Sequence, residues 1–329
     1  MSTLLVEVTR VDRVESTHQG SIAVVDSTGG VIASAGDPDR FLYFRSSAKP
    51  FQAIPVVESG AADRYGFTPA ELALCCASHA GSIQHQEQVA AALAKLGLDE
   101  HALQCGISGP ADEQAHAAIE LGERPKTQLT CDCSGKHTGM LATCLHLGLP
   151  IDTYLDPAHP LQVTIKGLIA EACGLSPSEL HMGIDGCSLP TFGATLAHFA
   201  RAFAELARPT RHEAALNRLR SAMIAHPFNV AGEGDEVTTL MRAGNGDIVA
   251  KSGAEGLICI GVPSRGLGIA IRIDDGSFRS HAVVAVEALR QLDAAPASVL
   301  EQITAVHRPE IRTHNGRAVG EMRPAFTLS

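Results

Sequence analysis

Ser46 and Lys49 form a pair whose residue types and spacing could support covalent catalysis. Residues three apart on a helix share one face, so the two side chains would lie within hydrogen-bonding reach. A serine hydroxyl becomes a good nucleophile when a base takes its proton, and a desolvated lysine can be that base. Pro50 fits only the first turn of a helix, although it also biases Lys49 away from helical backbone angles. The pair therefore predicts Ser46 as nucleophile and Lys49 as general base at a helix N-terminus.

The chain around this pair offers a second serine and a second lysine. A strand and a short turn precede Ser46, which is where penicillin-recognising enzymes place the same pair, with a Lys-Thr-Gly-like element on a late strand. Here Lys251-Ser252-Gly253 ends a late strand. Ser78, in residues 74–81, could pair with Lys251. The alternative is that these residues are only a helix end terminated by Gly81.

Two cysteine-containing segments offer donors for a metal. Residues 130–137, TCDCSGKH, place Cys133 near Lys136 at a helix start, where the pKa of a thiol is lowered. The Gly-Lys step lacks the first glycine and the hydroxyl residue of a phosphate-binding loop, so we reject nucleotide binding. Residues 183–190, GIDGCSLP, place Asp185 and Cys187 in a glycine-flanked turn. Two thiolates and a further ligand would form an open zinc site, while free buried thiols are the alternative, because spacing cannot decide between them.

The composition excludes several classes of protein. The 329 residues are 45% hydrophobic and carry a formal net charge of −10 without a basic block, so nucleic acid is not an expected partner. The N-terminal residues resemble neither a signal peptide nor a membrane span, which predicts a cytoplasmic protein without membrane contact. The nine cysteines lack the spacing of a disulfide scaffold and are expected to be reduced.

The hydrophobic periodicity predicts a sheet from both chain ends and helices between them. Apolar and polar residues alternate over residues 4–11, 21–26, 31–35, 247–251, 256–262 and 268–273, and a helix is expected over 278–292. Further helices are expected over residues 51–59, 69–76, 84–96, 111–121, 137–147, 161–173, 190–206 and 212–224. The result would be one catalytic domain over 1–329, with a sheet region at about 1–45 and 246–329 and a helical region at about 46–245.

The motifs RSSAKPFQ, CASHAG, CSGKH, GIDGCSLP and KSGAEG together resemble those of the rhizobial-type, class 3 L-asparaginases, also called the L-asparaginase II family. They occur in the family's order and cover nearly the whole chain. The resemblance implies an α/β fold similar to serine β-lactamases and glutaminases, with an antiparallel sheet from both chain ends and an inserted helical region. It also implies a homodimer.

Matched residue by residue, the resemblance assigns roles in the site. It implies two catalytic pairs, Ser46 with Lys49 and Ser78 with Lys251. It implies one zinc ion per chain, held by Cys133, Lys136 and Cys187, with Asp185 beside them. A lysine ligand must be neutral to bind metal. Residues 232–235, GEGD, depart from the pattern where we would expect a basic residue near position 235, so no substrate contact is assigned there.

The predicted function is hydrolysis of L-asparagine to L-aspartate and ammonia by an L-asparaginase. Ser46 would attack the side-chain amide with Lys49 as base, and backbone N–H groups at the helix start would stabilise the oxyanion. Ser78 and Lys251 would complete the proton relay. Charge complementarity makes Arg45 and Glu255 candidates for binding the α-carboxylate and α-ammonium. The candidate substrate-binding residues are Arg45, His79, Asp185 and Glu255.

Three other functions remain open at the level of sequence. A glutaminase or another small-amide hydrolase on the same scaffold differs by one methylene of substrate. A non-catalytic zinc or thiol sensor could be built around Cys133 and Cys187. A penicillin-binding or β-lactamase-like enzyme shares the Ser-Lys pair, but the expected cytoplasmic location argues against it. The zinc could act as a Lewis acid or as an anchor for the two cysteine loops, and we favour the anchor.

Overall fold

The computed structural model describes residues 1–295, 299, 303 and 308–329. The chain divides into two compact units, which it enters alternately. Unit 1 comprises Met1–Ser47, Ala194–Arg208 and Thr239–Ser329, and unit 2 comprises Ala48–Gly193 and Pro209–Thr238. The expectation of one catalytic domain stays a prediction.

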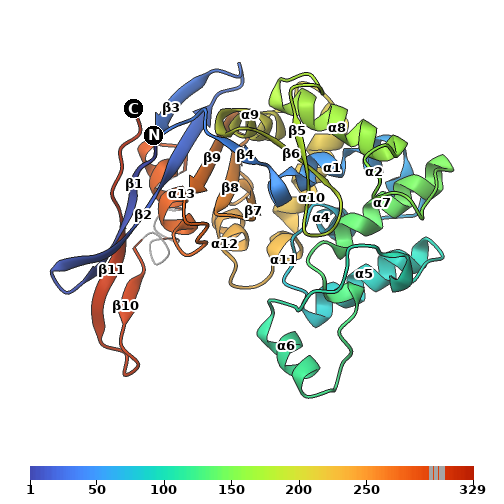
Figure 1. The fold of residues 1–329 in the computed structure, drawn as a ribbon, viewed down its shortest axis with the longest axis horizontal. Helices are drawn as coiled ribbons and strands as arrows, with labels where there is room; N and C mark the ends of the chain where they lie inside the picture. The colour runs from blue at the N-terminus through green and yellow to red at the C-terminus, as the bar shows by residue number, and fades with distance from the viewer. Residues whose placement is uncertain (296–298, 300–302, 304–307) are drawn as a thin grey trace. The chain divides into compact units, whose positions relative to one another are not determined.

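Unit 1 contains an antiparallel sheet built from both ends of the chain (Figure 1). Within the described ranges it has eight strands in the order β10-β11-β1-β2-β9-β8-β7, with β3 paired to β2. The strands of unit 1 are β1 (Thr3–Arg10), β2 (Arg13–Val25), β3 (Val31–Ala35), β4 (Phe41–Tyr43), β7 (Val249–Gly253), β8 (Leu257–Val262), β9 (Leu267–Ile273), β10 (Glu310–Arg312) and β11 (Ala318–Pro324). The predicted α/β fold with an antiparallel sheet from both termini is therefore confirmed.

The registers show how far apart in sequence the paired strands lie. Val6 of β1 pairs with Pro324 of β11, and Ile22 of β2 pairs with Ile271 of β9. The middle strands are buried, because every residue of β8 lies in the core. The six strands predicted from alternation are all present, five of them within a few residues of their predicted bounds, while β2 begins at Arg13, well before the predicted residue 21.

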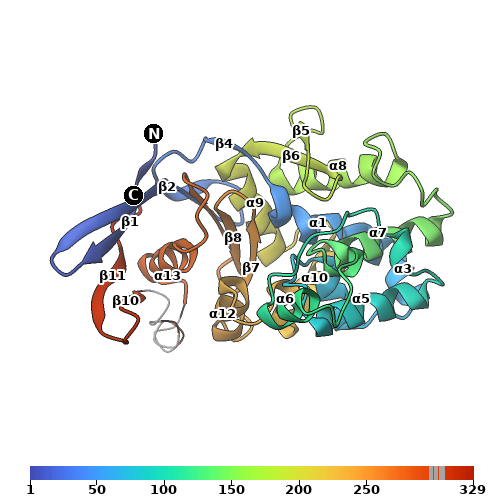
Figure 2. The ribbon, with the colours of Figure 1, turned by 60° about the horizontal axis from the view of Figure 1, so that its bottom comes forward.

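Helix α9 (Leu196–Ala207) comes from the middle of the sequence but packs on this sheet, against β2, β8 and β9 (Figure 2). Two glycines allow the close approach. A Cβ atom at Gly268 would lie 1.9 Å from the carbonyl oxygen of Ala200, and one at Gly261 would lie 2.9 Å from that of Phe203. Because any side chain there would collide with the helix backbone, these strand positions require glycine. Helix α13 (His281–Gln291) packs on β1, β9 and β11.

Unit 2 is mostly helical, as the sequence predicts. Its elements are α1 (Lys49–Gln52), α2 (Ile54–Glu58), α3 (Ala61–Arg64), α4 (Pro69–Cys75), α5 (Ile83–Lys95), the 3₁₀ helix η2 (Glu100–Ala102), α6 (Glu113–Glu120), the 3₁₀ helix η3 (Gln128–Thr130), α7 (Ser134–Leu147), α8 (Pro160–Cys173), the hairpin strands β5 (His181–Ile184) and β6 (Pro190–Thr195), α10 (Glu213–Ala225) and α11 (Pro227–Ala231). Three of the described elements cross the unit boundaries: the 3₁₀ helix η1 (Arg45–Ala48), α12 (Glu236–Ala243) and β6, whose last two residues belong to unit 1.

Three helix predictions were wrong in part. Residues 190–195 form strand β6 instead of the start of a helix, because Thr191, Phe192 and Thr195 favour extended backbone. The helix expected over 51–59 is broken at Ala53 into α1 and α2, each with a proline in its first turn. The helix expected from 278 begins at His281. The hairpin of β10 and β11 has no counterpart in the sequence prediction.

The crossing of α4 and α7 organises unit 2. Helix α7 is buried from Ser134 to Cys144. A Cβ atom at Gly135 would lie 2.4 Å from the carbonyl oxygen of Leu74, and one at Gly139 would lie 2.8 Å from Cys75 Sγ. Glycines four residues apart share one face of a helix, so α4 can approach the α7 backbone closely. The contact brings the segment after α4 next to the start of α7.

Every helix in the described part of the chain is too short or too polar to cross a lipid bilayer.

The two helical glycines Gly135 and Gly167 provide a matched test of this packing. Gly135→Ala should lower the free energy of unfolding by about 1–3 kcal/mol, since the new methyl group must push α7 away from α4. Gly167→Ala in α8 has no heavy atom within 4 Å of the added Cβ and should raise it by up to about 1 kcal/mol. Urea unfolding of both variants measures the difference, and two equal effects would contradict the close packing.

Candidate functional site

Ser46 lies in the turn that follows β4 in unit 1. Phe44 is fully buried and stacks on Phe199 of α9 with ring centroids 4.1 Å apart, which fixes the start of η1. Ser47 is also buried, and its hydroxyl donates to the backbone oxygen of Lys251 at 3.0 Å. Ser46 is only half-buried. Of these two neighbouring serines, Ser46 therefore presents the more accessible hydroxyl, at the helix start that the sequence predicts.

The end of β7 packs directly on this turn. A Cβ atom at Gly253 would lie 3.0 Å from Ser47 Oγ and 3.2 Å from the carbonyl oxygen of Phe44, so a larger residue would displace η1. Lys251 on the same strand is fully buried, and its Nζ donates to the backbone oxygen of Ser252 at 2.8 Å. Unit 1 thus brings the Ser46 turn and the Lys251 strand side by side.

A cavity of about 250 Å³ in unit 1 contains two of the predicted substrate-binding residues, Arg45 and Glu255. The cavity is lined by Arg40, Phe41, Leu42, Tyr43, Arg45, Glu255 and Arg272. Arg45 and Glu255 have φ angles of 48° and 65°, in the left-handed region that side chains larger than glycine rarely adopt. Such backbone strain is often found at functional sites. Arg272 adds positive charge that the sequence did not reveal, while Arg40 is ion-paired with Asp274 at 2.5 Å.

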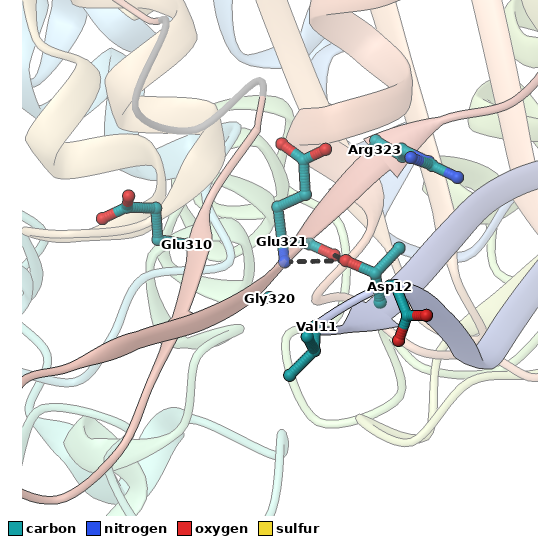
Figure 3. Close-up of a pocket in the computed structure, with 7 residues that line it drawn as sticks. Val11, Asp12, Glu310, Gly320, Glu321 and Arg323 are labelled. Atoms are coloured by element: carbon teal, nitrogen blue, oxygen red, sulfur yellow. Dashed lines mark hydrogen bonds between the residues drawn. The ribbon is translucent and has the colours of Figure 1, made fainter.

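A second cavity, of about 320 Å³, lies by the β10–β11 hairpin and contains none of the predicted residues (Figure 3). Its polar groups are already engaged. The Thr9 hydroxyl accepts from the N–H of Glu321 at 3.0 Å, and Arg323 forms an ion pair with Glu7 at 2.8 Å. We therefore base no site on this cavity.

Lys49 and Ser78 are in direct contact in unit 2. The Lys49 side chain has no exposed surface, and its Nζ donates to Ser78 Oγ at 2.8 Å. The nearest carboxylate is that of Asp132, with Oδ2 at 3.5 Å from Nζ. Within unit 2, Lys49 is a hydrogen-bond partner of Ser78, and the pairing of Ser78 with Lys251 stays a prediction. The contact forms a Ser-Lys pair of the kind expected for an activated hydroxyl.

The charge of Lys49 depends on the anions around it. Burial on its own would lower the pKa of this lysine, but the charges of Cys133 and Asp132 outweigh burial and raise it. Lys49 is therefore an ammonium while those groups are anionic. As an ammonium, Lys49 cannot act as a base; it must first lose a proton and become a neutral amine.

The three predicted zinc ligands gather at the start of α7. Lys136 Nζ donates to Cys187 Sγ at 3.1 Å, and all three side chains are buried. Hydrogen bonds from the thiols of Cys131 and Cys187 hold the pKa of Cys133 well below its usual range, and the nearby lysine charges act in the same direction. Two sulfur atoms and one nitrogen close together form a donor set that zinc accepts. The residues present thus fit the predicted metal.

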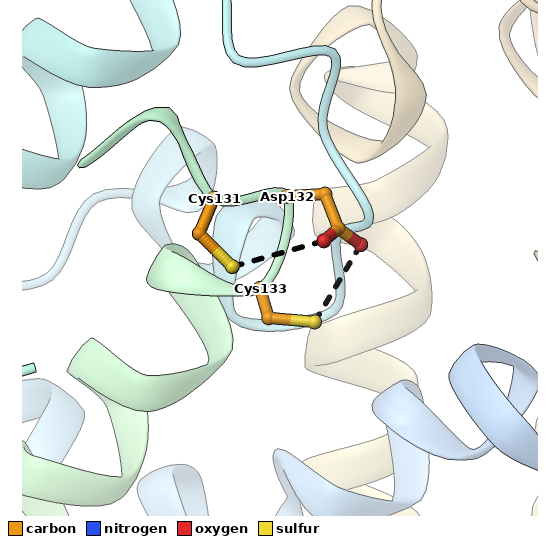
Figure 4. Close-up of side chains that lie close together, drawn as sticks. All are labelled: Cys131, Asp132 and Cys133. Atoms are coloured by element: carbon orange, nitrogen blue, oxygen red, sulfur yellow. Dashed lines mark hydrogen bonds between the residues drawn. The ribbon is translucent and has the colours of Figure 1, made fainter. Parts of the chain in front are cut away.

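Asp132 is the site residue that sequence reasoning missed. Its Oδ2 accepts from the Cys133 thiol at 3.5 Å, and its Oδ1 accepts from the Cys131 thiol at 3.8 Å (Figure 4). The three donor atoms lie within 4.8 Å of one another. A carboxylate flanked by two cysteines was the available signal, but it was not used. Asp185, which was predicted, is half-buried, and its charge helps to raise the pKa of Lys136.

His79 uses both of its ring nitrogens inside the protein. Nδ1 accepts from the N–H of Gly81 at 3.1 Å, so Nε2 carries the proton and donates to Ser134 Oγ at 2.9 Å. The neighbouring His85 stacks on His79, and its Nε2 donates to the carbonyl oxygen of Phe228 at 3.0 Å. Both contacts help to hold the loop after α4 in place. A substrate contact of His79 stays a prediction.

Comparison with known proteins places the chain near one family and several solved structures. The sequence model described as L-asparaginase II matches residues 6–324. No match was found among curated proteins. Similar solved structures include one titled Mglu (15% identity, TM-score 0.42, covering 87% of this chain and 65% of that one). A beta-lactamase from Mycobacterium bovis is 15% identical, with a TM-score of 0.42 over 88% of this chain and 92% of that one. The probable glutaminase ybaS is 14% identical, with a TM-score of 0.42 over 88% of this chain and 84% of that one.

The two stacked histidines predict a loss of stability in mild acid. Burial lowers the pKa of His79 well below 6.5 and also lowers that of His85. Below about pH 6.5 the unfolded chain therefore binds protons that the folded chain does not, and the stability falls by up to about 1.4 kcal/mol per pH unit for each histidine.

Urea unfolding between pH 7.5 and 5.5 measures this slope, and ring ¹⁵N shifts show which nitrogens carry protons. We expect the His79 ring to stay neutral in the folded protein as the pH falls below 6.5, with its single proton on Nε2. An unfolding free energy that stays constant over this range would contradict the prediction.

Proposed function

Because the chain belongs to the L-asparaginase II family of amidohydrolases, we propose that it hydrolyses L-asparagine to L-aspartate and ammonia. The observation that carries the proposal is the buried Lys49, whose Nζ lies 2.8 Å from Ser78 Oγ. A buried lysine on a hydroxyl is a known way to activate a serine in amide hydrolysis. The half-buried Ser46, three residues before Lys49, supplies the nucleophile.

The reaction follows the usual two steps of a serine hydrolase. Ser46 Oγ attacks the side-chain carbonyl of asparagine while neutral Lys49 accepts the hydroxyl proton, directly or through Ser78. The same proton passes to the departing nitrogen, so that ammonia leaves and the β-carboxyl group is bound to Ser46 as an ester. Water then attacks this ester with Lys49 again as the base. Aspartate leaves and Ser46 regains its proton.

Lys49 needs a way to become neutral, since the anions beside it stabilise its charged form. Zinc held by Cys133, Lys136 and Cys187 would neutralise the two thiolates and so weaken their hold on the Lys49 proton. Lys136 would bind as a neutral amine. We propose that this ion, one per chain, mainly anchors the two loops that carry the cysteines.

Substrate recognition is proposed for the cavity that holds Arg45 and Glu255. A guanidinium can bind the α-carboxylate through two parallel hydrogen bonds, and Glu255 can accept from the α-ammonium. Arg272 lines the same cavity and adds attraction for a carboxylate, whereas Arg40 is ion-paired with Asp274. Asp185 and His79 are retained as further proposed contacts. Lys251 is proposed to relay protons with Ser78, and the protein is proposed to act as a cytoplasmic homodimer.

Ser46 and Ser47 provide a matched test of the nucleophile. Ser46→Ala should reduce kcat for ammonia release from asparagine by at least about 1,000-fold, because the bond-forming oxygen is gone. Ser47→Ala loses only the hydrogen bond to the Lys251 backbone, so it should cost about 1 kcal/mol of stability and keep kcat within about tenfold. A Ser46→Ala protein with full turnover would refute the mechanism, and loss of turnover in Ser78→Ala alone would move the nucleophile to Ser78.

Asparagine and glutamine differ by one methylene, so a single cavity can separate them by about 1–3 kcal/mol. We expect kcat/KM for asparagine to exceed that for glutamine by about 10- to 200-fold. Ammonia release from both substrates, measured on one enzyme preparation, gives the ratio. The reverse ratio would identify a glutaminase, and metal binding without any ammonia release would identify a zinc or thiol sensor.

Removal of the metal tests the proposed anchoring role. A chelator should lower the Tm, because a ligand bound to the folded protein stabilises it. Turnover should persist at alkaline pH, where Lys49 loses its proton without help. Differential scanning calorimetry and ammonia release on the same chelated sample measure both quantities. Complete loss of turnover at every pH, restored by added zinc, would instead indicate that the metal takes part in the chemistry.

A further inference from the structure

We infer that Arg272 restricts the substrate to amino acids with a free α-carboxylate, which it binds beside Glu255 in the cavity of unit 1; the inference rests on the proposed function and deepens it. The cavity of about 250 Å³ is lined by four charged side chains, which are Arg40, Arg45, Glu255 and Arg272. They differ in how far the protein itself already compensates their charges. That difference indicates which guanidinium binds the substrate's carboxylate.

Arg272 is a half-buried guanidinium whose charge is poorly compensated. Within the described part of the chain, its side chain makes neither a hydrogen bond nor an ion pair. By contrast, Arg40 donates to Asp274 at 2.5 Å and to the Ser2 hydroxyl at 2.8 Å. A guanidinium stays charged in proteins, and a charge that is partly removed from water without a partner is costly. An anionic group of a ligand at Arg272 would remove this cost.

The electrostatic surroundings of Arg272 favour one kind of ligand. Burial is the main cause that lowers the pKa of Arg272, and the charge of Arg40 acts in the same direction. Glu255, Asp274 and Asp275 act in the opposite direction, but among the described residues none of these carboxylates forms an ion pair with Arg272. Because Glu255 and Arg272 line one cavity without touching, a ligand with adjacent opposite charges can bind between them. An α-amino acid carries such charges on one carbon atom.

The fold holds both groups in place before a ligand binds. Arg272 lies on β9, where it pairs with Leu257 of β8 on one side and with Ser21 of β2 on the other. Glu255 lies in the turn between β7 and β8 with a φ of 65°, a strained conformation that surrounding structure must maintain. Groups fixed in this way lose little conformational entropy on binding. Arg272 can therefore hold a carboxylate through two parallel hydrogen bonds while Glu255 accepts from the ammonium.

The consequence for the substrate is that both of its α groups must be free. L-Asparagine meets this condition. Asparagine within a peptide, or with its α-carboxylate converted to an amide, leaves Arg272 without its anion and should be a poor substrate, because a site built for a polar group discriminates against analogues that lack it. The cavity is also smaller than the range of about 300–1,000 Å³ that is typical of sites for larger ligands.

Kinetics with L-asparagine and its α-N-methylamide test the assignment. The methylamide keeps the α-ammonium and the side-chain amide but lacks the α-carboxylate, and only its side chain can release ammonia. We expect Arg272→Gln to lower kcat/KM for L-asparagine by about 10- to 100-fold, mainly through KM, and to leave the low kcat/KM for the methylamide unchanged. Arg272→Lys, which keeps the charge, should recover part of the loss. The matched control Arg40→Gln should change both values by less than about threefold, since Arg40 is already paired with Asp274.

Calorimetric titration with L-aspartate adds a measurement that does not depend on turnover. The wild type and Arg40→Gln should bind L-aspartate alike, and Arg272→Gln should bind it at least about tenfold more weakly. Circular dichroism establishes that each variant folds.

Three results would overturn the inference. These are equal losses of kcat/KM for both substrates in Arg272→Gln, as expected of a purely structural residue, wild-type turnover of the methylamide as fast as that of L-asparagine, and L-aspartate binding that is absent from the wild type or unchanged in Arg272→Gln. A wild-type chain that releases no ammonia from L-asparagine would instead refute the proposed function. Calorimetry would still decide the role of Arg272 in that case, so the two failures are distinguishable.

Discussion

The charge of the fully buried Lys49 is the constraint on which the unit 2 site depends. An ammonium without exposed surface must be compensated by hydrogen bonds and anions, or it would lose its proton. Ser78 and Asp132 provide these contacts, and they come from segments far apart in the sequence. Both segments are placed by the α4–α7 crossing, which in turn requires Gly135. Helix packing and electrostatics are therefore parts of one requirement.

The same contacts create a conflict between stability and reactivity. The anions that stabilise the Lys49 ammonium in the resting protein oppose its use as a base. A cation at Cys133 and Cys187 would relieve this conflict without touching the reacting atoms. In the proposed mechanism, the thiol cluster would thus influence the proton transfer through charge alone.

Local patterns predicted the elements, and long-range packing explains what they missed. Alternation revealed β1, β2 and β3 because each strand carries its own periodic signal. The placement of α9 on the sheet could not be read locally, since it depends on Gly261 and Gly268, which lie more than fifty residues later. In the same way, spacing alone could not reveal that Lys49 reaches Ser78. For Asp132 the two flanking cysteines are visible in the sequence, but its contact with Lys49, 83 residues away, is not.

The alternation of the chain between the two units also constrains the order in which the protein can fold. Strand β2 pairs with β9, and β1 pairs with β11, so the central sheet needs residues from both ends of the chain. During synthesis from the N-terminus, β1 and β2 must wait with unpaired edges until the ribosome has made nearly the whole chain. The helices of unit 2 can form meanwhile. Neither unit corresponds to a continuous gene fragment, and truncating the last strands would remove a neighbour of the first one.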